Sequence, residues 1–220
     1  NMSGIAGRLF RRLVGRNQPV TRETTAQIKA SKEQIFAKQA SDRLTEDSSL
    51  RRKASPIGEF SSPLVHKTIK NLKQIAKRES LSSLSAPQVG RSLRLFVLDL
   101  DPPSDFSVII NPRIIDFGGI QISEEEYCCS LPGFTFDVKR YPKARVEYHN
   151  EEGVLIEKEL IGLPARCFQH EMDHLEGKLV TDYANSPLDF KPIDDKAVAP
   201  GVTTVFSDDV KARRNARKAS

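Results

Sequence analysis

Two histidines in the second half of the chain have the residue types and the spacing of a metal site. His170 and His174 stand four residues apart and enclose Glu171 in the pattern H-E-x-x-H. Residues i and i+4 of a helix lie on one face, so both imidazoles can bind one metal ion there. Glu171, next to the first histidine, can then act as a general base toward a water molecule at the metal. The pattern by itself also fits a helix that carries two surface histidines.

A third candidate ligand lies upstream in residues 126–130 (E-Y-C-C-S), which have the composition of a strand. A catalytic metal site keeps three protein ligands and leaves one position for water. Neighbouring residues of a strand point to opposite faces, so only one of Cys128 and Cys129 can face the histidines. We predict that Cys167, three residues before His170, is a small buried side chain rather than a ligand.

The surrounding sequence predicts a mixture of helices and strands. Apolar residues recur at helical spacing over 64–78, which indicates an amphipathic helix. The metal helix should begin near Pro164, because proline favours a first helical turn, and end at Gly177, a residue suited to a helix end. Strands are predicted at residues 93–100, 108–112 and 113–117, and a hairpin at 144–149 and 154–160. We therefore expect an α+β fold, with mostly antiparallel sheets around a central H-E-x-x-H helix and with basic extensions at both ends.

The whole chain has a net charge of +5, and its basic residues are concentrated at the two ends. Residues 1–54 carry 12 Lys and Arg against 5 Asp and Glu, and residues 186–220 carry 7 against 5. We therefore divide the chain into a basic N-terminal extension (1–54), a metal-binding domain (55–185) and a basic C-terminal tail (186–220). Basic ends on a more acidic body are typical of a targeting segment, or of arms that bind phosphate groups.

The first 22 residues contain five arginines and no acidic residue, with apolar residues interleaved at helical spacing. This composition is typical of a mitochondrial transit helix and equally of a basic helix that binds RNA, while a solvated tail is the plainer alternative. Residues 24–44 could form a polar helix, and Arg51-Arg52-Lys53 is predicted as a linker.

Cysteine content and hydropathy exclude two further classes of protein. Three cysteines, two of them adjacent, do not make a disulfide framework and favour a reducing compartment, with metal binding or catalysis as their use. No apolar run approaches the roughly 18–20 residues that a membrane-spanning helix needs, so we expect no membrane span.

Residues 56–183 resemble a peptide deformylase, and three segments in the family's order carry the resemblance. Residues 169–177 match the family signature Q-H-E-x-D-H-L-x-G in full. The segment that is normally E-G-C-L-S is present as residues 126–130 (E-Y-C-C-S). The segment that is normally G-φ-G-φ-A-A-P-Q-x-G, where φ is apolar, is present as residues 81–90 (L-S-S-L-S-A-P-Q-V-G).

The resemblance implies an enzyme that removes the formyl group from the N-terminal formyl-methionine of newly made polypeptides. By this resemblance, Cys128, His170 and His174 would bind one divalent metal ion, Fe(II) or Zn(II). The alignment of the second segment with the family favours Cys128 over Cys129 as the sulfur ligand.

The resemblance also implies which groups would act on the substrate. Glu171 would take a proton from water and pass it to the leaving amine. The side-chain amide of Gln88 and the backbone N–H of Cys129 would hold the formyl oxygen as it becomes an oxyanion.

Several residues that would shape the substrate groove depart from the family pattern. Leu81 and Ser83 stand at two glycines, Ser85 at an alanine, Tyr127 at a glycine and Cys129 at a leucine. A side chain at a glycine position can fill space that the substrate backbone needs. All the residues with chemical roles are present, so the pattern fits a deformylase with a reshaped groove, and also a homologue kept for its surface.

We therefore predict an organellar metallohydrolase, located in the mitochondrial matrix, that deformylates nascent chains. Its basic termini would bring it to the ribosome through ribosomal RNA. The alternative is a deformylase-like structural or assembly subunit of a mitochondrial ribosome, with weak activity or none and with its arms on ribosomal RNA. A zinc peptidase would rest on H-E-x-x-H alone.

Overall fold

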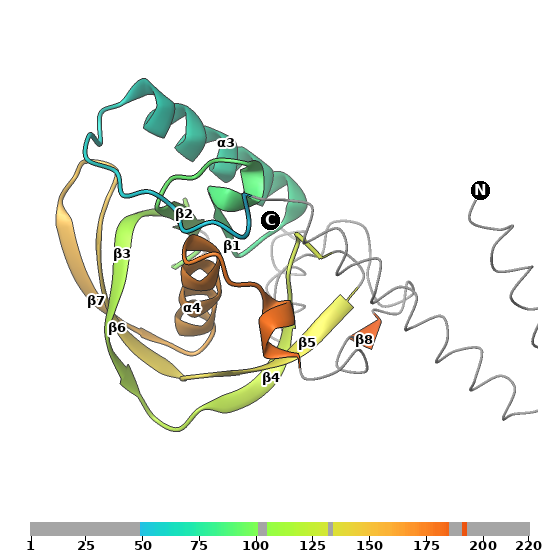
Figure 1. Ribbon diagram of the computed structural model, residues 1–220. Coiled ribbons are helices and arrows are strands. Elements are labelled where there is room, and N and C mark those ends of the chain that lie inside the picture. Colours follow the sequence, from blue (N-terminus) through green and yellow to red (C-terminus); the bar gives the residue numbers. More distant parts are fainter. Residues whose placement is uncertain (1–48, 101–104, 132–133, 185–190, 193–220) are drawn as a thin grey trace, which may run out of the picture.

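The computed structural model describes residues 49–100, 105–131, 134–184 and 191–192 (Figure 1). The transit-like segment, the predicted helix at 24–44 and nearly all of the C-terminal tail lie outside the described residues. The division of the chain at residues 54 and 185 therefore stays a prediction.

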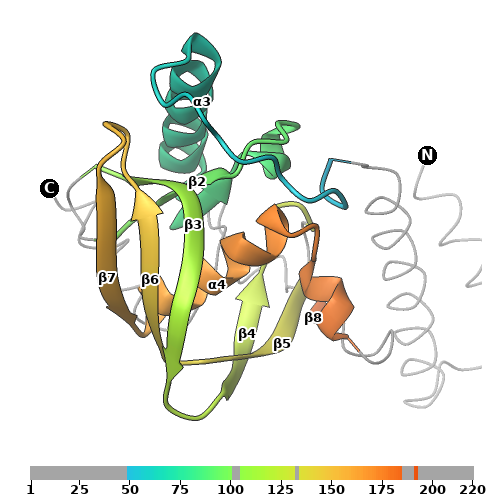
Figure 2. The ribbon, with the colours of Figure 1, turned by 60° about the vertical axis from the view of Figure 1, so that its left-hand side comes forward.

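Two antiparallel sheets enclose a central helix, α4 (Leu163–Leu175), which lies between them in both views (Figures 1 and 2). The larger sheet has the strand order β1-β2-β3-β6-β7, and the smaller one β4-β5-β8. The strands are β1 (Ser83–Ser85), β2 (Leu95–Leu98), β3 (Ser107–Gly118), β4 (Ile122–Tyr127), β5 (Phe134–Arg140), β6 (Lys143–His149), β7 (Leu155–Ile161) and β8 (Lys191–Pro192). The predicted α+β class, with antiparallel sheets around the H-E-x-x-H helix, is confirmed.

The first helix of the described chain, α3 (Pro63–Glu79), confirms the amphipathic helix predicted over 64–78. It begins at a proline, which suits a first helical turn, and it ends where Ser80 adopts a left-handed conformation with φ of 56°. Its apolar face is buried with side chains of β1 and β2 in one hydrophobic cluster. The helix thereby covers the end of the larger sheet that is formed by β1 and β2 (Figure 2).

Strand β3 is one strand where we predicted two. Its pairing with β6 (Lys143–His149) shifts register between Ile110 and Arg113. At this point Asn111 has a positive φ of 49°, and its side-chain amide accepts from the N–H of Ile57 and donates to the carbonyl of Ile57. Such a bulge accommodates Pro112, which has no N–H to donate, and the strand continues beyond it.

Helix α4 has glycines at both ends because the chain turns sharply there. Gly162 precedes it with φ of 67°, Pro164 stands in its first turn, and Gly177 follows with φ of 75°. A Cβ atom added to Gly177 would lie 2.7 Å from the backbone oxygen of Arg51. The predicted limits of this helix agree with the structure to within two residues.

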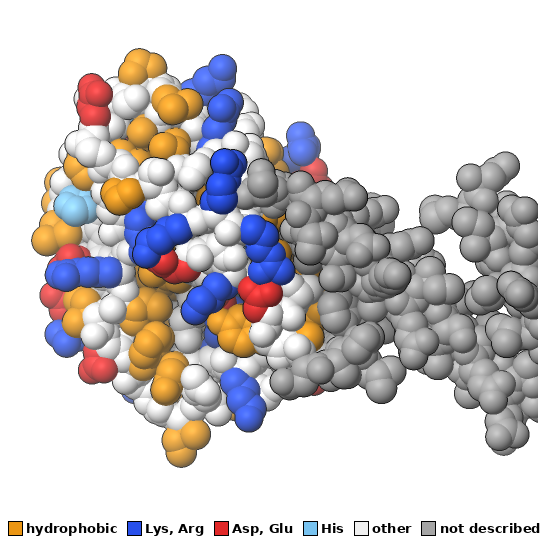
Figure 3. All heavy atoms as spheres, viewed as in Figure 1, with side chains coloured by type: hydrophobic (Ala, Val, Ile, Leu, Met, Phe, Trp, Pro, Cys, Tyr) orange, Lys and Arg blue, Asp and Glu red, His pale blue; other side chains and the backbone are white. Residues whose placement is uncertain are grey.

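Residues 51–54 cross the carboxyl end of α4, although we predicted Arg51-Arg52-Lys53 as a linker. The N–H of Ala54 donates to the carbonyl of Leu175 at 2.8 Å. Arg51 pairs with Asp182 at 2.7 Å, and Lys53 pairs with Glu176 at 2.8 Å. On the face shown in Figure 3, Lys and Arg side chains lie scattered among apolar and uncharged groups.

Hydrophobic residues bury both sides of α4. On one side Phe168 packs edge-to-face on Phe96 of β2, with ring centroids 5.1 Å apart. On the other side a separate cluster gathers around β5 and the turn after β4, and it includes Cys128 and Phe136. Polar side chains of α4 that point into this interior must find partners, because burying a polar group without one is costly.

Candidate metal centre

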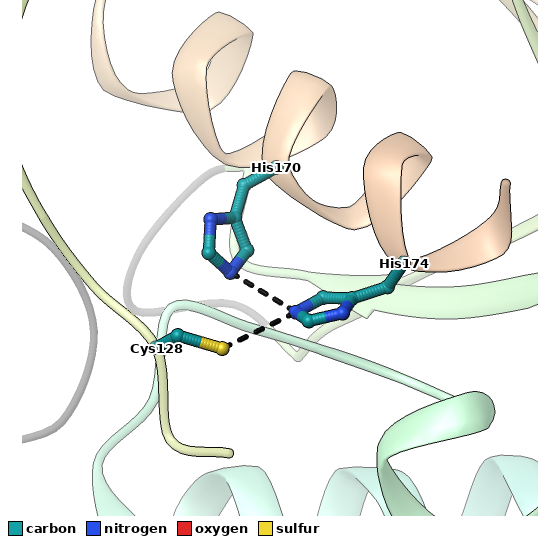
Figure 4. A group of neighbouring side chains, drawn as sticks. All are labelled: Cys128, His170 and His174. Carbon is teal, nitrogen blue, oxygen red and sulfur yellow. Dashed lines mark hydrogen bonds between the residues drawn. The ribbon is translucent and has the colours of Figure 1, made fainter. Parts of the chain in front are cut away.

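Cys128, His170 and His174 bring three ligand atoms together inside the protein (Figure 4). All three side chains are buried, and the three ligand atoms lie within 4.8 Å of one another. The Nε2 atom of His174 lies 3.3 Å from the Sγ atom of Cys128 and 3.2 Å from Nε2 of His170. The two histidines come from α4, one turn apart, and the cysteine comes from the segment that follows β4.

The strand that we predicted through residues 126–130 ends earlier. Strand β4 stops at Tyr127, and Cys128 and Cys129 lie in a turn that is closed by the N–H of Leu131 donating to the carbonyl of Cys128. Opposite strand faces therefore do not explain why only one of the two cysteines faces the histidines. The turn nevertheless directs Cys128 to the histidines, while the Sγ atom of Cys129 accepts a hydrogen bond from Nε2 of Gln88 at 3.2 Å.

His170 is oriented by a buried carboxylate. Its Nδ1 atom lies 3.0 Å from Oε2 of Glu126, which also accepts hydrogen bonds from Arg140 and Arg166. Burial alone would raise the pKa of Glu126, but the hydrogen bond of His170 and the charge of Arg140 outweigh it and lower the pKa to about 2. An ionised carboxylate accepts the proton on Nδ1, which leaves Nε2, on the side of Cys128 and His174, as the nitrogen that would bind a metal ion.

The donor set fits a divalent metal ion. Burial alone would raise the pKa of the Cys128 thiol, but the charge of His174 and hydrogen bonds of both histidines lower it. Burial lowers the pKa of His170, but the hydrogen bonds of Cys128 and Glu126 raise it well above its ordinary value. A thiolate beside two imidazoles thus favours a cation among these three side chains. One thiolate and two imidazoles suit Zn(II) and Fe(II).

Cys129 and Cys167 are not part of this group of three ligand atoms. Burial and the nearby charges of Cys128 and Glu171 raise the pKa of the Cys129 thiol well above its ordinary value. Burial, followed by the charges of Glu171 and Glu126, raises the pKa of Cys167 as well. Cys167 is buried in the hydrophobic cluster on the far side of α4. The structure therefore agrees with the predicted choice of Cys128 and with the packing role predicted for Cys167.

The remaining candidates from the sequence lie around the three ligands. Glu171 is fully buried, and its Oε1 atom accepts a hydrogen bond from Oγ of Ser83 at 2.6 Å. Its second oxygen, Oε2, has no hydrogen-bond partner among the residues that the structure describes. The Nε2 atom of Gln88 lies 3.2 Å from Sγ of Cys129 and 3.9 Å from Sγ of Cys128. The Gln88 amide therefore lies beside the cysteine ligand, and Glu171, next to His170 along α4, keeps one carboxylate oxygen without a partner in the described chain.

Leu81 and Tyr127 are two residues whose side chains we expected to shape the substrate groove. Leu81 is buried in the cluster under α3, where it fills the core. Tyr127 is half-buried, and burial together with the charges of Cys129 and Cys128 raises its pKa to about 12. Leu81 therefore takes no space from the site, whereas Tyr127 lies next to it.

From the sequence we did not predict the buried charged side chains that hold the ligand His170 in place. Glu126, Arg140 and Arg166 form a buried charge network, and Arg140 further pairs with Asp173 at 2.6 Å. A signal was present in β5, where the buried positions alternate along the strand and Arg140 occupies one of them. An arginine at a core position needs an acidic partner, which alternation alone could not identify.

Comparison with known proteins assigns the chain to a family. The family model described as polypeptide deformylase matches residues 43–189. The chain belongs to the polypeptide deformylase family. The peptide deformylase of Thermotoga neapolitana is 37% identical over 140 residues, which are 64% of this chain and 84% of that protein. The peptide deformylase of Thermodesulfovibrio yellowstonii is 42% identical over 145 residues, 64% of this chain and 86% of that one.

The fold of this deformylase also matches solved structures. The crystal structure of the peptide deformylase of Synechococcus elongatus in complex with actinonin superposes with a TM-score of 0.62 at 35% identity, and it covers 70% of this chain and 87% of that chain. Together with the Cys-His-His site, the match makes the chain a metal-dependent hydrolase of the peptide deformylase type. Within the described residues, no helix has the length and apolar character needed to cross a membrane.

Proposed function

We propose that this deformylase acts in the mitochondrial matrix and removes the formyl group from formyl-methionine at the N-terminus of nascent polypeptides. The observation that carries the proposal is the buried carboxylate of Glu171, which has one unpartnered oxygen and stands next to a ligand of a Cys-His-His site. A general base needs such a free oxygen close to the water that it deprotonates.

The residues of the site divide the work of amide hydrolysis. A divalent ion held by Cys128, His170 and His174 supplies Lewis-acid chemistry, which makes water more acidic and a carbonyl carbon more electrophilic. Glu171 takes a proton from the attacking water at Oε2 and delivers it to the leaving amine. The amide of Gln88 donates to the formyl oxygen as negative charge develops on it, together with the backbone N–H of Cys129.

The metal is Fe(II) or Zn(II) in this proposal. Both ions accept a ligand set of one thiolate and two imidazoles. The hydrogen bond from His170 to Glu126 supports tight binding of either ion, because it fixes the ring orientation and makes Nε2 more basic.

The proposed location and partner rest on the basic ends of the chain. Five arginines without an acidic residue in the first 22 positions support a mitochondrial targeting helix. Basic residues at both ends support contact with ribosomal RNA, where formylated chains emerge. Removing residues 1–42, which precede the family match, should abolish co-sedimentation with mitochondrial ribosomes at moderate salt. Continued co-sedimentation of the shortened protein would rule out the N-terminal arm as an anchor.

The activity is tested with a formyl-Met-Ala-Ser peptide and protein that is purified without oxygen and loaded with Fe(II). Release of formate by the wild-type protein, and its fall to a small residual rate in a Glu171→Gln variant that still binds one metal ion, would support the proposal. Absence of turnover in a fully metallated wild-type protein would contradict it. That result would favour the alternative function, a subunit of the mitochondrial ribosome with a deformylase fold.

A further inference from the structure

Strand β1 (Ser83–Ser85) places two serine hydroxyls in the interior. All three of its residues are buried, with Ser83 1% and Ser85 0% exposed. Side chains alternate along a strand, so both serines face one side of β1 and Leu84 faces the other. Leu84 joins the hydrophobic cluster under α3. A buried hydroxyl is costly unless it forms a hydrogen bond, and both serines bond to residues of the proposed active site.

Ser83 holds one oxygen of Glu171. Its Oγ atom donates to Oε1 at 2.6 Å, a short hydrogen bond between two buried groups. The other oxygen, Oε2, is buried and has no partner within the described chain. The bond therefore fixes the rotation of the carboxylate and leaves Oε2 as the oxygen available to a proton.

Ser85 determines which end of the Gln88 amide faces the metal ligands. The backbone N–H and the Oγ atom of Ser85 both lie 2.9 Å from Oε1 of Gln88. A backbone N–H can only donate, so the atom opposite it must be the amide oxygen. The amide nitrogen then points the other way, toward Sγ of Cys129 at 3.2 Å and Oγ of Ser130 at 3.4 Å.

We infer that Ser83 and Ser85 are positioning residues, which together orient the proton acceptor and the oxyanion donor of this deformylase. The inference rests on the proposed roles of Glu171 and Gln88. The two serines stand where the family pattern has a glycine and an alanine, neither of which carries a hydroxyl. At these two positions we expected side chains that reshape the groove. Their hydroxyls instead form hydrogen bonds to Glu171 and Gln88.

Kinetics of single variants test the inference. Ser83→Ala should lower kcat about tenfold with KM nearly unchanged, because a hydrogen bond to a charged group is lost while substrate contacts remain. Ser85→Ala should lower kcat by roughly threefold, because the backbone N–H still holds the amide oxygen. Ser83→Thr keeps a hydroxyl and should recover most of the activity. Thr68→Val removes a buried hydroxyl that bonds within α3 and should leave kcat and KM as they are.

A double-mutant cycle separates positioning from general damage to the fold. In a Glu171→Gln background, Ser83→Ala should lower the residual kcat by less than about twofold, because the carboxylate that it orients is gone. An equal tenfold loss in both backgrounds, or an unchanged kcat in Ser83→Ala alone, would overturn the role of Ser83. An unchanged kcat in Ser85→Ala would overturn the role of Ser85.

Crystal structures of the Co(II)-loaded proteins give a readout that does not depend on turnover. In Ser83→Ala the carboxylate of Glu171 should rotate, while the visible absorption spectrum of bound Co(II) should match that of the wild-type protein. A carboxylate that keeps its wild-type orientation would overturn the inference even if the enzyme proves inactive. An inactive wild-type protein whose Glu171 rotates in the variant would instead refute the proposed function and leave the positioning contact established.

Discussion

The carboxylate of Glu126 lies 3.0 Å from Nδ1 of His170, and both side chains are buried. The same carboxylate accepts hydrogen bonds from Arg140 and Arg166, so one acidic group joins a metal ligand to two cations. Arg140 also pairs with Asp173 at 2.6 Å and Arg166 with Glu124 at 3.0 Å, but of these three acids only Glu126 is fully buried. Glu126 therefore serves both the metal centre and the stability of the fold.

Replacing Glu126 by Gln should weaken metal binding about tenfold to a hundredfold, because the orienting charge behind His170 is lost. It should also lower the free energy of unfolding by about 2 kcal/mol, since both guanidinium groups lose a buried charged partner and keep only Asp173 and Glu124. Competition with a chelator and urea unfolding measure the two effects. Glu147→Gln breaks the exposed pair with Arg113 and should change neither the metal affinity nor the free energy of unfolding by a comparable amount. Equal effects of the two variants would refute the special role of Glu126.

Cys128 and Cys129 should respond differently to replacement. Cys128→Ala should abolish stoichiometric metal binding, whereas Cys129→Ala should retain one ion per chain, because only Cys128 meets the histidines. Removing the metal from the wild-type protein should lower Tm, since an ion that binds the folded state stabilises it. Elemental analysis and calorimetry measure both properties. Loss of metal from Cys129→Ala with retention by Cys128→Ala would reverse the assignment of the sulfur ligand.

Gln88→Ala should lower kcat roughly a hundredfold while the metal content stays at one ion per chain. The amide acts as an oxyanion donor in the proposed mechanism, and loss of such a donor is typically that costly. Steady-state kinetics with a formyl-methionyl peptide measure the change. A kcat within twofold of the wild type would leave Gln88 without a part in the reaction.

Gly177→Ala should be strongly destabilising, by more than about 1 kcal/mol, because this residue has a φ of 75°. Its new Cβ would also lie 2.7 Å from the backbone oxygen of Arg51, which cannot move as a side chain could. The free energy of unfolding in urea measures the effect. Gly58→Ala is the matched control, because nothing lies within 4 Å of a Cβ added there. Similar losses in both variants would show that the contact with Arg51 relaxes.

The ion pairs of Asp105 with Lys73 and Lys77 should contribute a small, pH-dependent stability. The hydrogen bond of Lys77 outweighs burial and, with Lys73, lowers the pKa of Asp105 from 3.8 to about 2. A lowered pKa in the folded state stabilises the fold above pH 3.8 and loses this effect as the pH falls toward 2. Asp105 is exposed, so the contribution should stay below about 1 kcal/mol.

The Asp105→Asn variant tests this relation by urea unfolding over a range of pH. It should be slightly less stable than the wild type at pH 7, and the difference should shrink below pH 4 and in 1 M salt. A stability difference that grows as the pH falls would show that ionised Asp105 does not stabilise the fold.

Much of the site could be predicted from local sequence, because its central motif is continuous. His170, Glu171 and His174 lie on one helix, where a period of 3.6 residues alone brings i and i+4 to the same face. The limits of α4 could also be predicted from the sequence, because Pro164 and Gly177 have strong preferences for helix ends. Those residues needed no knowledge of the rest of the fold.

The tertiary structure decided which residues complete the site. Cys128 meets the histidines through a turn after β4, where strand alternation did not apply. Ser83 reaches Glu171 across 88 positions of sequence, a pairing that no local pattern encodes. Periodicity reports which face of an element is buried, whereas the partner of a buried polar group depends on which elements pack together. Sequence therefore determined the family and the chemistry, and packing determined what orients the reacting groups.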